Sequence, residues 1–172
     1  MKLTRFFATI AALAVLAAPL AQAAPPKAGD VAPDEIGKTL DGAKVLLSDH
    51  KGKVVIVSFW ATWCAYCLKE LPILEGIQKV AGKQHNVQVL AVNTEKRDTF
   101  RKLSELMKNF TMGMAYDPEK TGQAAFGVKG IPHLVIVGRD GVIVSVYRGY
   151  GEETLDKITA DINKAIGAKP AS

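Results

Sequence analysis

Apolar and polar positions along the chain predict strands and helices in alternation. Residues 54–59 are nearly all apolar and mostly β-branched, which is typical of a strand buried on both faces of a sheet. A helical pattern follows over residues 64–81, and Pro72 within it is expected to kink the helix. A second strand over residues 87–93 and a charged helix over residues 96–108 come next. This order predicts a sheet covered by helices.

The pattern also predicts a hairpin near each end of this core. Residues 36–40 and 44–47 flank Asp41-Gly42, a dipeptide that tolerates the positive φ angles of a tight turn. The later elements are expected to be a strand at 112–116, a short helix at 120–126, a hairpin from 134–137 and 142–147, and a helix at 153–166. We therefore predict an α/β fold with a mixed sheet, helices on both faces and an added N-terminal β-hairpin.

One face of the helix expected at 64–81 is apolar except for a single acid. This face carries Cys67, Glu70, Leu71, Ile73, Leu74, Ile77 and Ala81. The opposite face carries Leu68, Lys69, Glu75, Gly76 and Lys79. In the middle of an apolar face a carboxylate loses solvation, so the pKa of Glu70 should rise, unless the side chain bends out to water. Glu70 is therefore a candidate proton shuttle for Cys67.

The chain has two cysteines, and both lie in the unit Cys64-Ala65-Tyr66-Cys67. A disulfide that closes so short a ring stabilises a fold by only about 2 kcal/mol, so a redox role is favoured over a structural one. Cys64, expected to be exposed at the helix start, is the predicted nucleophile, because the helix N-terminus stabilises a thiolate. Cys67 is the predicted resolving thiol. Zinc is not expected, because four-ligand sites need further ligands at suitable spacing.

A proline, a histidine and two tryptophans are also expected near the redox pair. Pro132, just before a strand, marks either a strand edge or a cis-proline in a tight turn, and its loop could present backbone groups to an extended substrate. The adjoining His133 is expected to be solvated or hydrogen-bonded, and the alternatives are tuning of the thiolate or metal binding. Of Trp60 and Trp63, one is expected in the core and the other over the active surface, and the alternative is a structural role for both.

The N-terminus indicates the compartment. Lys2 and Arg5 precede an apolar stretch that ends in Ala21-Gln22-Ala23, so residues 1–23 are expected to be a cleaved signal peptide, with an uncleaved membrane anchor as the alternative. Cleavage would leave 149 residues with a formal net charge of +3, beginning with an irregular lead-in at 24–35. Basic residues are mixed with acidic ones along the chain, so nucleic-acid binding is not expected.

Several motifs together resemble the thioredoxin-like family. They are Phe59-Trp60-Ala61-Thr62-Trp63-Cys64-Ala65-Tyr66-Cys67, Pro72 five residues later, and Gly130-Ile131-Pro132. The motifs Ala32-Pro33-Asp34, Asp41-Gly42, Lys51-Gly52-Lys53 and Cys67-Leu68-Lys69-Glu70-Leu71-Pro72 make the chain most similar to the exported TlpA, ResA and DsbE (CcmG) branch. The resemblance covers nearly the whole mature chain, with the domain expected at 36–168.

The resemblance implies a periplasmic thiol-disulfide oxidoreductase without a cofactor, and we expect it to reduce disulfides in periplasmic proteins. It implies that Cys64 attacks, Cys67 resolves, Pro132 is a cis-proline and Glu70 is the buried glutamate of ResA-like members. Substrate contacts are then expected at Trp63, Tyr66, Ile131 and Pro132. The implied partners are protein thiols and disulfides such as apocytochrome c, and a membrane electron donor of the DsbD or CcdA type.

The chain also departs from the family pattern at specific positions. Ser58 stands where thioredoxin has a buried aspartate, and Ala65-Tyr66 lacks the common proline between the cysteines, which puts the direction of electron flow in doubt. Two other functions stay open. One is a Cu(I)-binding assembly factor that uses both cysteines and His133 as soft ligands. The other, weaker one is a peroxiredoxin, although Ala61 and Val57 replace the threonine and proline expected there.

Overall fold

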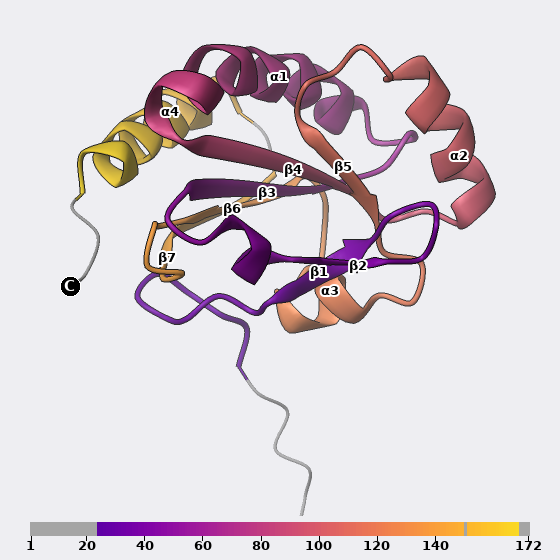
Figure 1. Ribbon diagram of the computed structural model, residues 1–172, viewed down its shortest axis with the longest axis horizontal. Coiled ribbons are helices and arrows are strands. Elements are labelled where there is room, and N and C mark those ends of the chain that lie inside the picture. The colour runs from indigo at the N-terminus through magenta and orange to yellow at the C-terminus, as the bar shows by residue number, and fades with distance from the viewer. Residues whose placement is uncertain (1–23, 150, 169–172) are drawn as a thin grey trace, which may run out of the picture.

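The computed structural model describes residues 24–149 and 151–168, and the expected signal peptide lies outside them. In the described part, the strands form one sheet in the order β2-β1-β5-β4-β3-β6-β7 (Figure 1). The strands are β1 (Glu35–Lys38), β2 (Lys44–Leu46), β3 (Val54–Trp60), β4 (Val87–Asn93), β5 (Gly113–Tyr116), β6 (His133–Val137) and β7 (Ile143–Arg148). The helices are the 3₁₀ helix η1 (Leu47–His50), α1 (Ala65–His85), α2 (Arg97–Leu106), α3 (Thr121–Ala125) and α4 (Glu152–Gly167).

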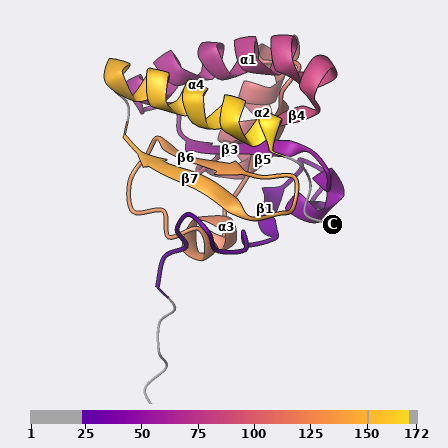
Figure 2. The ribbon, with the colours of Figure 1, turned by 90° about the vertical axis from the view of Figure 1, so that its left-hand side faces the viewer.

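The sheet is mixed and has helices on both faces. Strands β3, β4 and β5 are parallel, whereas β1, β6 and β7 pair antiparallel with their neighbours. Helices α1 and α2 connect the parallel strands and lie on one face of the sheet, where α4 joins them, while α3 covers the other face (Figures 1 and 2). The expected α/β architecture and the hairpin of β1 and β2 are confirmed.

Alternate residues of β3 supply a separate apolar core to each face. Val54, Ile56 and Trp60 pack under α1 and α4, whereas Val55 and Phe59 pack on the α3 side. Every residue of β3 is buried, as expected for a central strand. Ser58 lies between Ile56 and Trp60 in this alternation, so its hydroxyl faces α1.

Helix α1 differs from its expected form in length and in its buried face. It continues through Pro72 to His85 and ends at Asn86, which has a φ of 53°. Ile73, expected on the buried face, is 37% exposed. Glu75, expected on the solvent face, is only 5% exposed. The predicted faces were therefore wrong for these two residues, and for Glu75 the reason is the set of hydrogen-bond donors around its carboxylate.

Glu75 is buried because it binds the segment that leads into β5. Its carboxylate oxygens accept hydrogen bonds from the Thr111 N–H at 2.9 and 3.0 Å, the Thr111 hydroxyl at 3.0 Å and the Met112 N–H at 3.1 Å. Burial alone would raise the pKa of Glu75, but these donors stabilise the carboxylate and lower its pKa below the ordinary value. Glu75 therefore joins α1 to the start of a strand 36 residues further along the chain.

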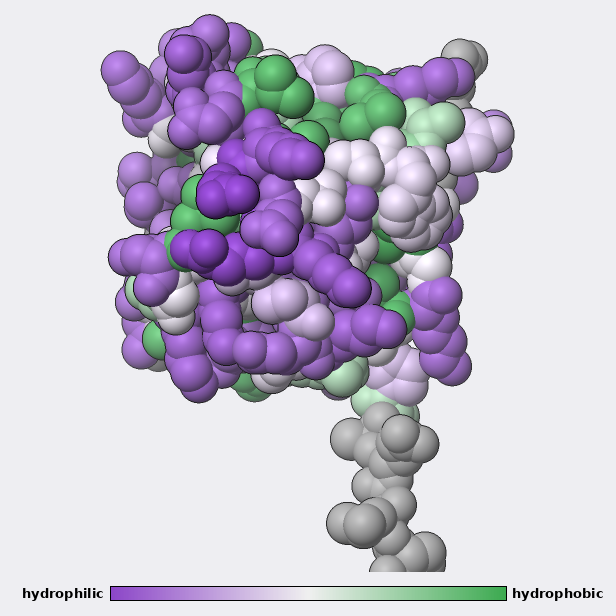
Figure 3. Space-filling model, turned by 90° about the vertical axis from the view of Figure 1, so that its right-hand side faces the viewer, coloured by the Kyte–Doolittle hydropathy of each residue, from purple (hydrophilic) through white to green (hydrophobic). Residues whose placement is uncertain are grey.

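The lead-in and α2 also have defined places in the structure. Residues 29–32 are hydrogen-bonded to residues 141–143, including a bridge between Val31 and Val142, so this part of the lead-in is attached to the domain. The surface that includes α2 is mainly hydrophilic (Figure 3), as expected from its charged sequence. No helix among the described residues has the length and apolar character that crossing a membrane requires.

We expect Glu75→Ala to lower the free energy of unfolding by about 2–4 kcal/mol, because it leaves buried N–H groups without an acceptor. The loss should shrink as the pH falls through the lowered pKa of Glu75, because protonation removes the same stabilisation from the wild type. Urea unfolding at several pH values measures both effects.

Lys79→Ala is the matched control for this prediction. It removes the ion pair between the exposed Lys79 ammonium group and Glu75 (3.4 Å) but leaves the hydrogen bonds of Glu75 to Thr111 and Met112 intact. The control should change stability by less than about 0.5 kcal/mol. Equal losses in the two variants would contradict the role assigned to the hydrogen bonds.

Candidate redox site

The site lies at the edge of the sheet where β3 and β4 end and β6 begins. Trp60, the last residue of β3, pairs in parallel with Asn93, the last residue of β4. Phe59 pairs antiparallel with His133, the first residue of β6. The segments that follow β3 and β4 and the segment that precedes β6 therefore meet at this edge. The segment between β3 and α1 contains Cys64.

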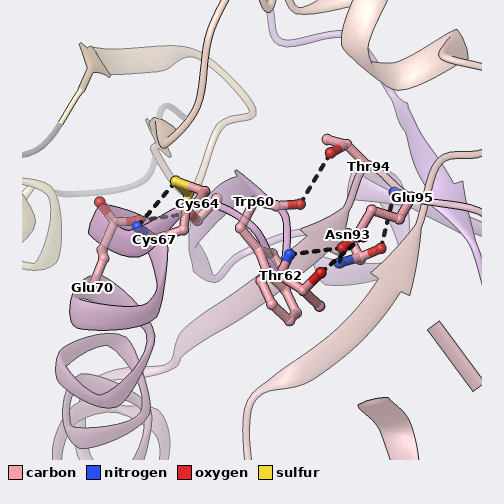
Figure 4. Close-up of a disulfide and its surroundings, with 9 residues drawn as sticks. Trp60, Thr62, Cys64, Cys67, Glu70, Asn93, Thr94 and Glu95 are labelled. Atoms are coloured by element: carbon pink, nitrogen blue, oxygen red, sulfur yellow. Dashed lines mark hydrogen bonds between the residues drawn. A yellow bond between two sulfur atoms is a disulfide. The ribbon is translucent and has the colours of Figure 1, made fainter. Parts of the chain in front are cut away.

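The two cysteines form a disulfide at the start of α1. Their Cα atoms are 5.2 Å apart, and the Cys67 N–H donates a hydrogen bond of 3.1 Å to Cys64 Sγ (Figure 4). Cys64 is the N-cap residue of α1, so its sulfur takes the place of the usual capping oxygen. Only 7% of Cys64 and 1% of Cys67 are exposed. The expected order of exposure is confirmed, but the expectation of a well-exposed Cys64 was wrong, because the residue also packs into the α1-side core.

Glu70 lies one turn along α1 from Cys67 and is 3% exposed, so it does not bend out to water. Its Oε1 accepts a hydrogen bond of 2.6 Å from the Ser58 hydroxyl. Burial raises the pKa of Glu70 above its ordinary value, and the Ser58 hydrogen bond opposes part of that rise. Ser58 thus binds a carboxyl group at the position where thioredoxin has its own buried acid.

Large side chains next to the cysteines in the sequence are exposed. Trp63, Tyr66 and Leu68 are 72%, 57% and 49% exposed. The Lys69 Nζ lies 5.8 Å from the centre of the Tyr66 ring, within cation–π range. Trp60, in contrast, is buried, which confirms that one of the two tryptophans packs in the core, while Trp63 is exposed.

The loop before β6 lies at the same edge of the sheet, because His133 pairs with Phe59. The peptide bond between Ile131 and Pro132 is cis, which is one of the two alternatives for this proline. Pro132 is buried, and its carbonyl oxygen accepts a hydrogen bond of 2.8 Å from the Gly149 N–H. Ile131 is partly buried and packs against both apolar cores. The cysteine pair and Pro132 are therefore brought to one edge of the sheet.

His133 does not have the surroundings expected from the sequence. It is fully buried, neither ring nitrogen has a hydrogen-bond partner, and its ring meets Phe59 edge-on at 6.1 Å. Burial, with a smaller contribution from Arg148, lowers the pKa of His133 to about 4. The expectation of a solvated or hydrogen-bonded residue was wrong, because β6 turns this side chain into the core on the α3 side.

The position of His133 is also relevant to the Cu(I)-binding alternative, in which His133 and both cysteines would be the ligands. Phe59 and His133 belong to the α3 side of the sheet, whereas Cys64 and Cys67 pack in the core on the α1 side. His133 is therefore separated from the cysteines by the sheet. Within residues 24–149 and 151–168, no three His, Cys, Asp or Glu residues are grouped so that they could hold a metal ion.

One hydrogen-bonded cluster at this edge was not expected from the sequence. Glu95, two residues after β4, accepts hydrogen bonds from Thr62 in the connection that leads to Cys64 (Figure 4). Asn93 lies between them and contacts Glu95 as well. The only sign of this cluster in the sequence was a carboxylate just after a strand, and this pattern does not indicate which residue the carboxylate binds.

Comparison with known proteins agrees with this geometry. A family model described as the AhpC/TSA family matches residues 28–146. Thiol-disulfide oxidoreductase ResA from Bacillus thuringiensis subsp. konkukian is 30% identical over 138 residues, covering 76% of this chain and 78% of its own. Thioredoxin-like protein YneN from Bacillus subtilis is 34% identical over 123 residues, covering 70% and 71%.

Solved structures give the same result. A crystal structure from Chlorobium tepidum, assigned as a thiol:disulfide interchange protein DsbE, is 29% identical and superposes with a TM-score of 0.72. The match covers 84% of this chain and all of that one. The sequence and structural matches converge on one group of proteins with the thioredoxin-like fold. The chain belongs to the AhpC/TSA family of thioredoxin-like proteins and is a thiol-disulfide oxidoreductase of the ResA and DsbE type.

Proposed function

We propose that the chain reduces disulfides in exported proteins, with Cys64 as the attacking thiol and Cys67 as the resolving thiol. The observation that carries this proposal is the unequal setting of the two sulfurs. Cys64 Sγ accepts an N–H at the start of α1, which favours a thiolate there. Cys67 is more deeply buried, one turn from the buried carboxyl group of Glu70.

The reaction proceeds in two exchanges. The Cys64 thiolate attacks one sulfur of the substrate disulfide, a mixed disulfide forms, and the other substrate sulfur leaves as a thiolate. Cys67 then passes its proton to Glu70 and attacks Cys64 Sγ, which releases the second substrate thiolate. Two electrons pass to the substrate, and the Cys64–Cys67 disulfide remains. A membrane thiol-disulfide donor of the DsbD or CcdA type returns the pair to its dithiol form.

We assign substrate binding to the apolar surface around the disulfide. Trp63 and Tyr66 are exposed beside the cysteine pair, and the loop of Ile131 and Pro132 borders the same edge. Exposed apolar patches of this kind are typical of surfaces that bind other proteins. An extended segment of an unfolded protein fits such a surface, so apocytochrome c with an oxidised cysteine pair is the substrate that we propose.

We place this activity in the periplasm. Residues 1–23 act as a signal peptide, residues 24–35 form the lead-in, and residues 36–168 form the domain. The protein is free in the periplasm after cleavage, or held at the membrane where the segment is retained. The apolar N-terminal stretch with its basic residues supports this location.

Removal of either cysteine tests the two roles. We expect the dithiol form of the wild type to reduce insulin, and Cys64→Ser to abolish this activity because the attacking sulfur is lost. Cys67→Ser should retain the first exchange and accumulate a mixed disulfide through Cys64, detectable by mass spectrometry. A mixed disulfide through Cys67 in the Cys64→Ser variant, at the wild-type rate, would reverse the assignment.

The reduction potential of the pair tests the direction of electron flow. For a reductase we expect a value close to that of thioredoxin, about −270 mV. Equilibration with glutathione buffers of known composition measures it. A value near that of DsbA, about −120 mV, would make the protein an oxidant and contradict the proposed direction.

The pH dependence of turnover tests Glu70. Since the carboxyl group must be ionised to accept the Cys67 proton, the rate of the second exchange should rise with pH through the raised pKa of Glu70. Glu70→Gln should lose this rise and slow the second exchange by up to about a hundredfold. Stopped-flow measurement of the decay of the mixed disulfide gives the rate.

Ser58→Ala is the matched variant, because it removes the hydroxyl that stabilises the Glu70 carboxylate. The pKa of Glu70 should then increase further, and the rise in rate should move to higher pH. Unchanged pH profiles in both variants would show that Glu70 carries no proton in this reaction.

A further inference from the structure

The connection from β3 to Cys64 is bound by one side chain from the neighbouring connection. Glu95 Oε2 accepts a hydrogen bond of 2.7 Å from the Thr62 N–H, and Oε1 accepts one of 2.9 Å from the Thr62 hydroxyl. The Asn93 side-chain amide donates to Oε2 at 3.2 Å, and the Glu95 N–H donates to Asn93 Oδ1 at 2.9 Å. Figure 4 shows this cluster beside the disulfide.

The sheet makes this contact possible and holds it in place. Trp60 and Asn93 end their parallel strands side by side, so the connections that follow them start together. The Thr94 N–H and hydroxyl both donate to the Trp60 carbonyl oxygen, at 2.9 and 3.2 Å. Asn93 is fully buried. The carboxylate of Glu95 therefore reaches Thr62 from a backbone that is itself fixed at two points.

Thr62 controls the position of Cys64 because only Trp63 lies between them. The Cys64 N–H donates to the Ala61 carbonyl oxygen at 3.2 Å, which closes a tight turn around Thr62. The next contact along the chain is the hydrogen bond of 3.1 Å from the Cys67 N–H to Cys64 Sγ. A turn that shifts at Thr62 would move the sulfur relative to that N–H group.

Charge by itself does not explain the presence of Glu95. A carboxylate near a thiolate disfavours the thiolate, so its charge opposes the chemistry that we propose for Cys64. Among the described residues, Glu95 forms no ion pair with a lysine or arginine, and its partners are the neutral groups of Thr62 and Asn93. Its two oxygens match the two donors of one threonine residue, which indicates a geometric role.

We propose that Glu95 is a positioning residue of the redox site, which holds Cys64 Sγ against the N–H groups of α1 and so stabilises the reduced form of the pair. The residue acts through Thr62 and contacts neither cysteine in the hydrogen bonds of the site. This proposal rests on the redox role of the Cys64–Cys67 pair and names a residue that sets its equilibrium.

The test is the equilibrium of the isolated protein with glutathione, in which the protein dithiol and glutathione disulfide give the protein disulfide and two glutathione thiols. Glu95→Ala should shift this constant about tenfold toward the protein disulfide, which corresponds to a reduction potential about 30 mV lower. A residue that only supports the fold would destabilise both redox forms equally and leave the constant unchanged.

Glu95→Gln separates position from charge. The glutamine side-chain oxygen can accept a hydrogen bond from the Thr62 N–H, and the glutamine NH₂ group can donate one to the Thr62 hydroxyl oxygen. Both contacts with Thr62 are therefore retained without the charge. This variant should stay within about twofold of the wild type. The control is Glu105→Ala, which removes an exposed carboxylate on α2 and should leave the constant unchanged.

Two results would overturn the proposal. One is an unchanged constant in Glu95→Ala, and the other is an equal shift in Glu95→Ala and Glu95→Gln, which would assign the effect to charge. If Glu95→Ala does not fold, Thr62→Ala removes the hydroxyl contact alone and should shift the constant twofold to threefold in the same direction, so no shift there is equally decisive. Because this equilibrium needs no protein substrate, failure of insulin reduction by the wild type is a separate result.

Discussion

The sulfur of Cys64 is both the cap of α1 and the atom assigned to attack the substrate. A helix N-terminus leaves backbone N–H groups without partners, and an oxygen side chain usually accepts from one of them. Here the Cys67 N–H donates to Cys64 Sγ instead. The start of the helix and the redox state of the pair are thereby linked, because the charge on this sulfur changes when the disulfide is reduced.

Helix α1 carries two buried carboxyl groups whose surroundings give them different properties. Glu75 accepts hydrogen bonds from Thr111 and Met112, and these donors keep it ionised. Glu70 accepts one hydrogen bond, from the Ser58 hydroxyl. This single bond does not compensate for the loss of water around the carboxylate, so the pKa of Glu70 rises. The first group joins two elements of the fold, and the second is suited to hold and release a proton. The number of donors around each group makes the difference.

The sheet decides which residues meet at the site. Parallel pairing brings the ends of β3 and β4 together, and antiparallel pairing brings the start of β6 to the same edge. This arrangement places Glu95 against Thr62 and the loop of Pro132 beside the cysteine connection. The same strand alternation turns His133 to the opposite face, where it packs against Phe59.

The sequence by itself determined the elements and the chemistry that depend on neighbours in the chain. β-Branched runs predicted β3 and β4, helical spacing placed Glu70 on the buried face, and CxxC directly after a strand indicated a redox pair. Only the tertiary structure decided the burial of Glu75, the contact of Glu95 with Thr62 and the surroundings of His133. Their partners lie 36, 33 and 74 residues away along the chain. Local periodicity places a residue only by its angle on the helix, so it contains no information on the hydrogen-bond donors that folding brings from distant segments, and such donors bind the carboxylates of Glu75 and Glu95.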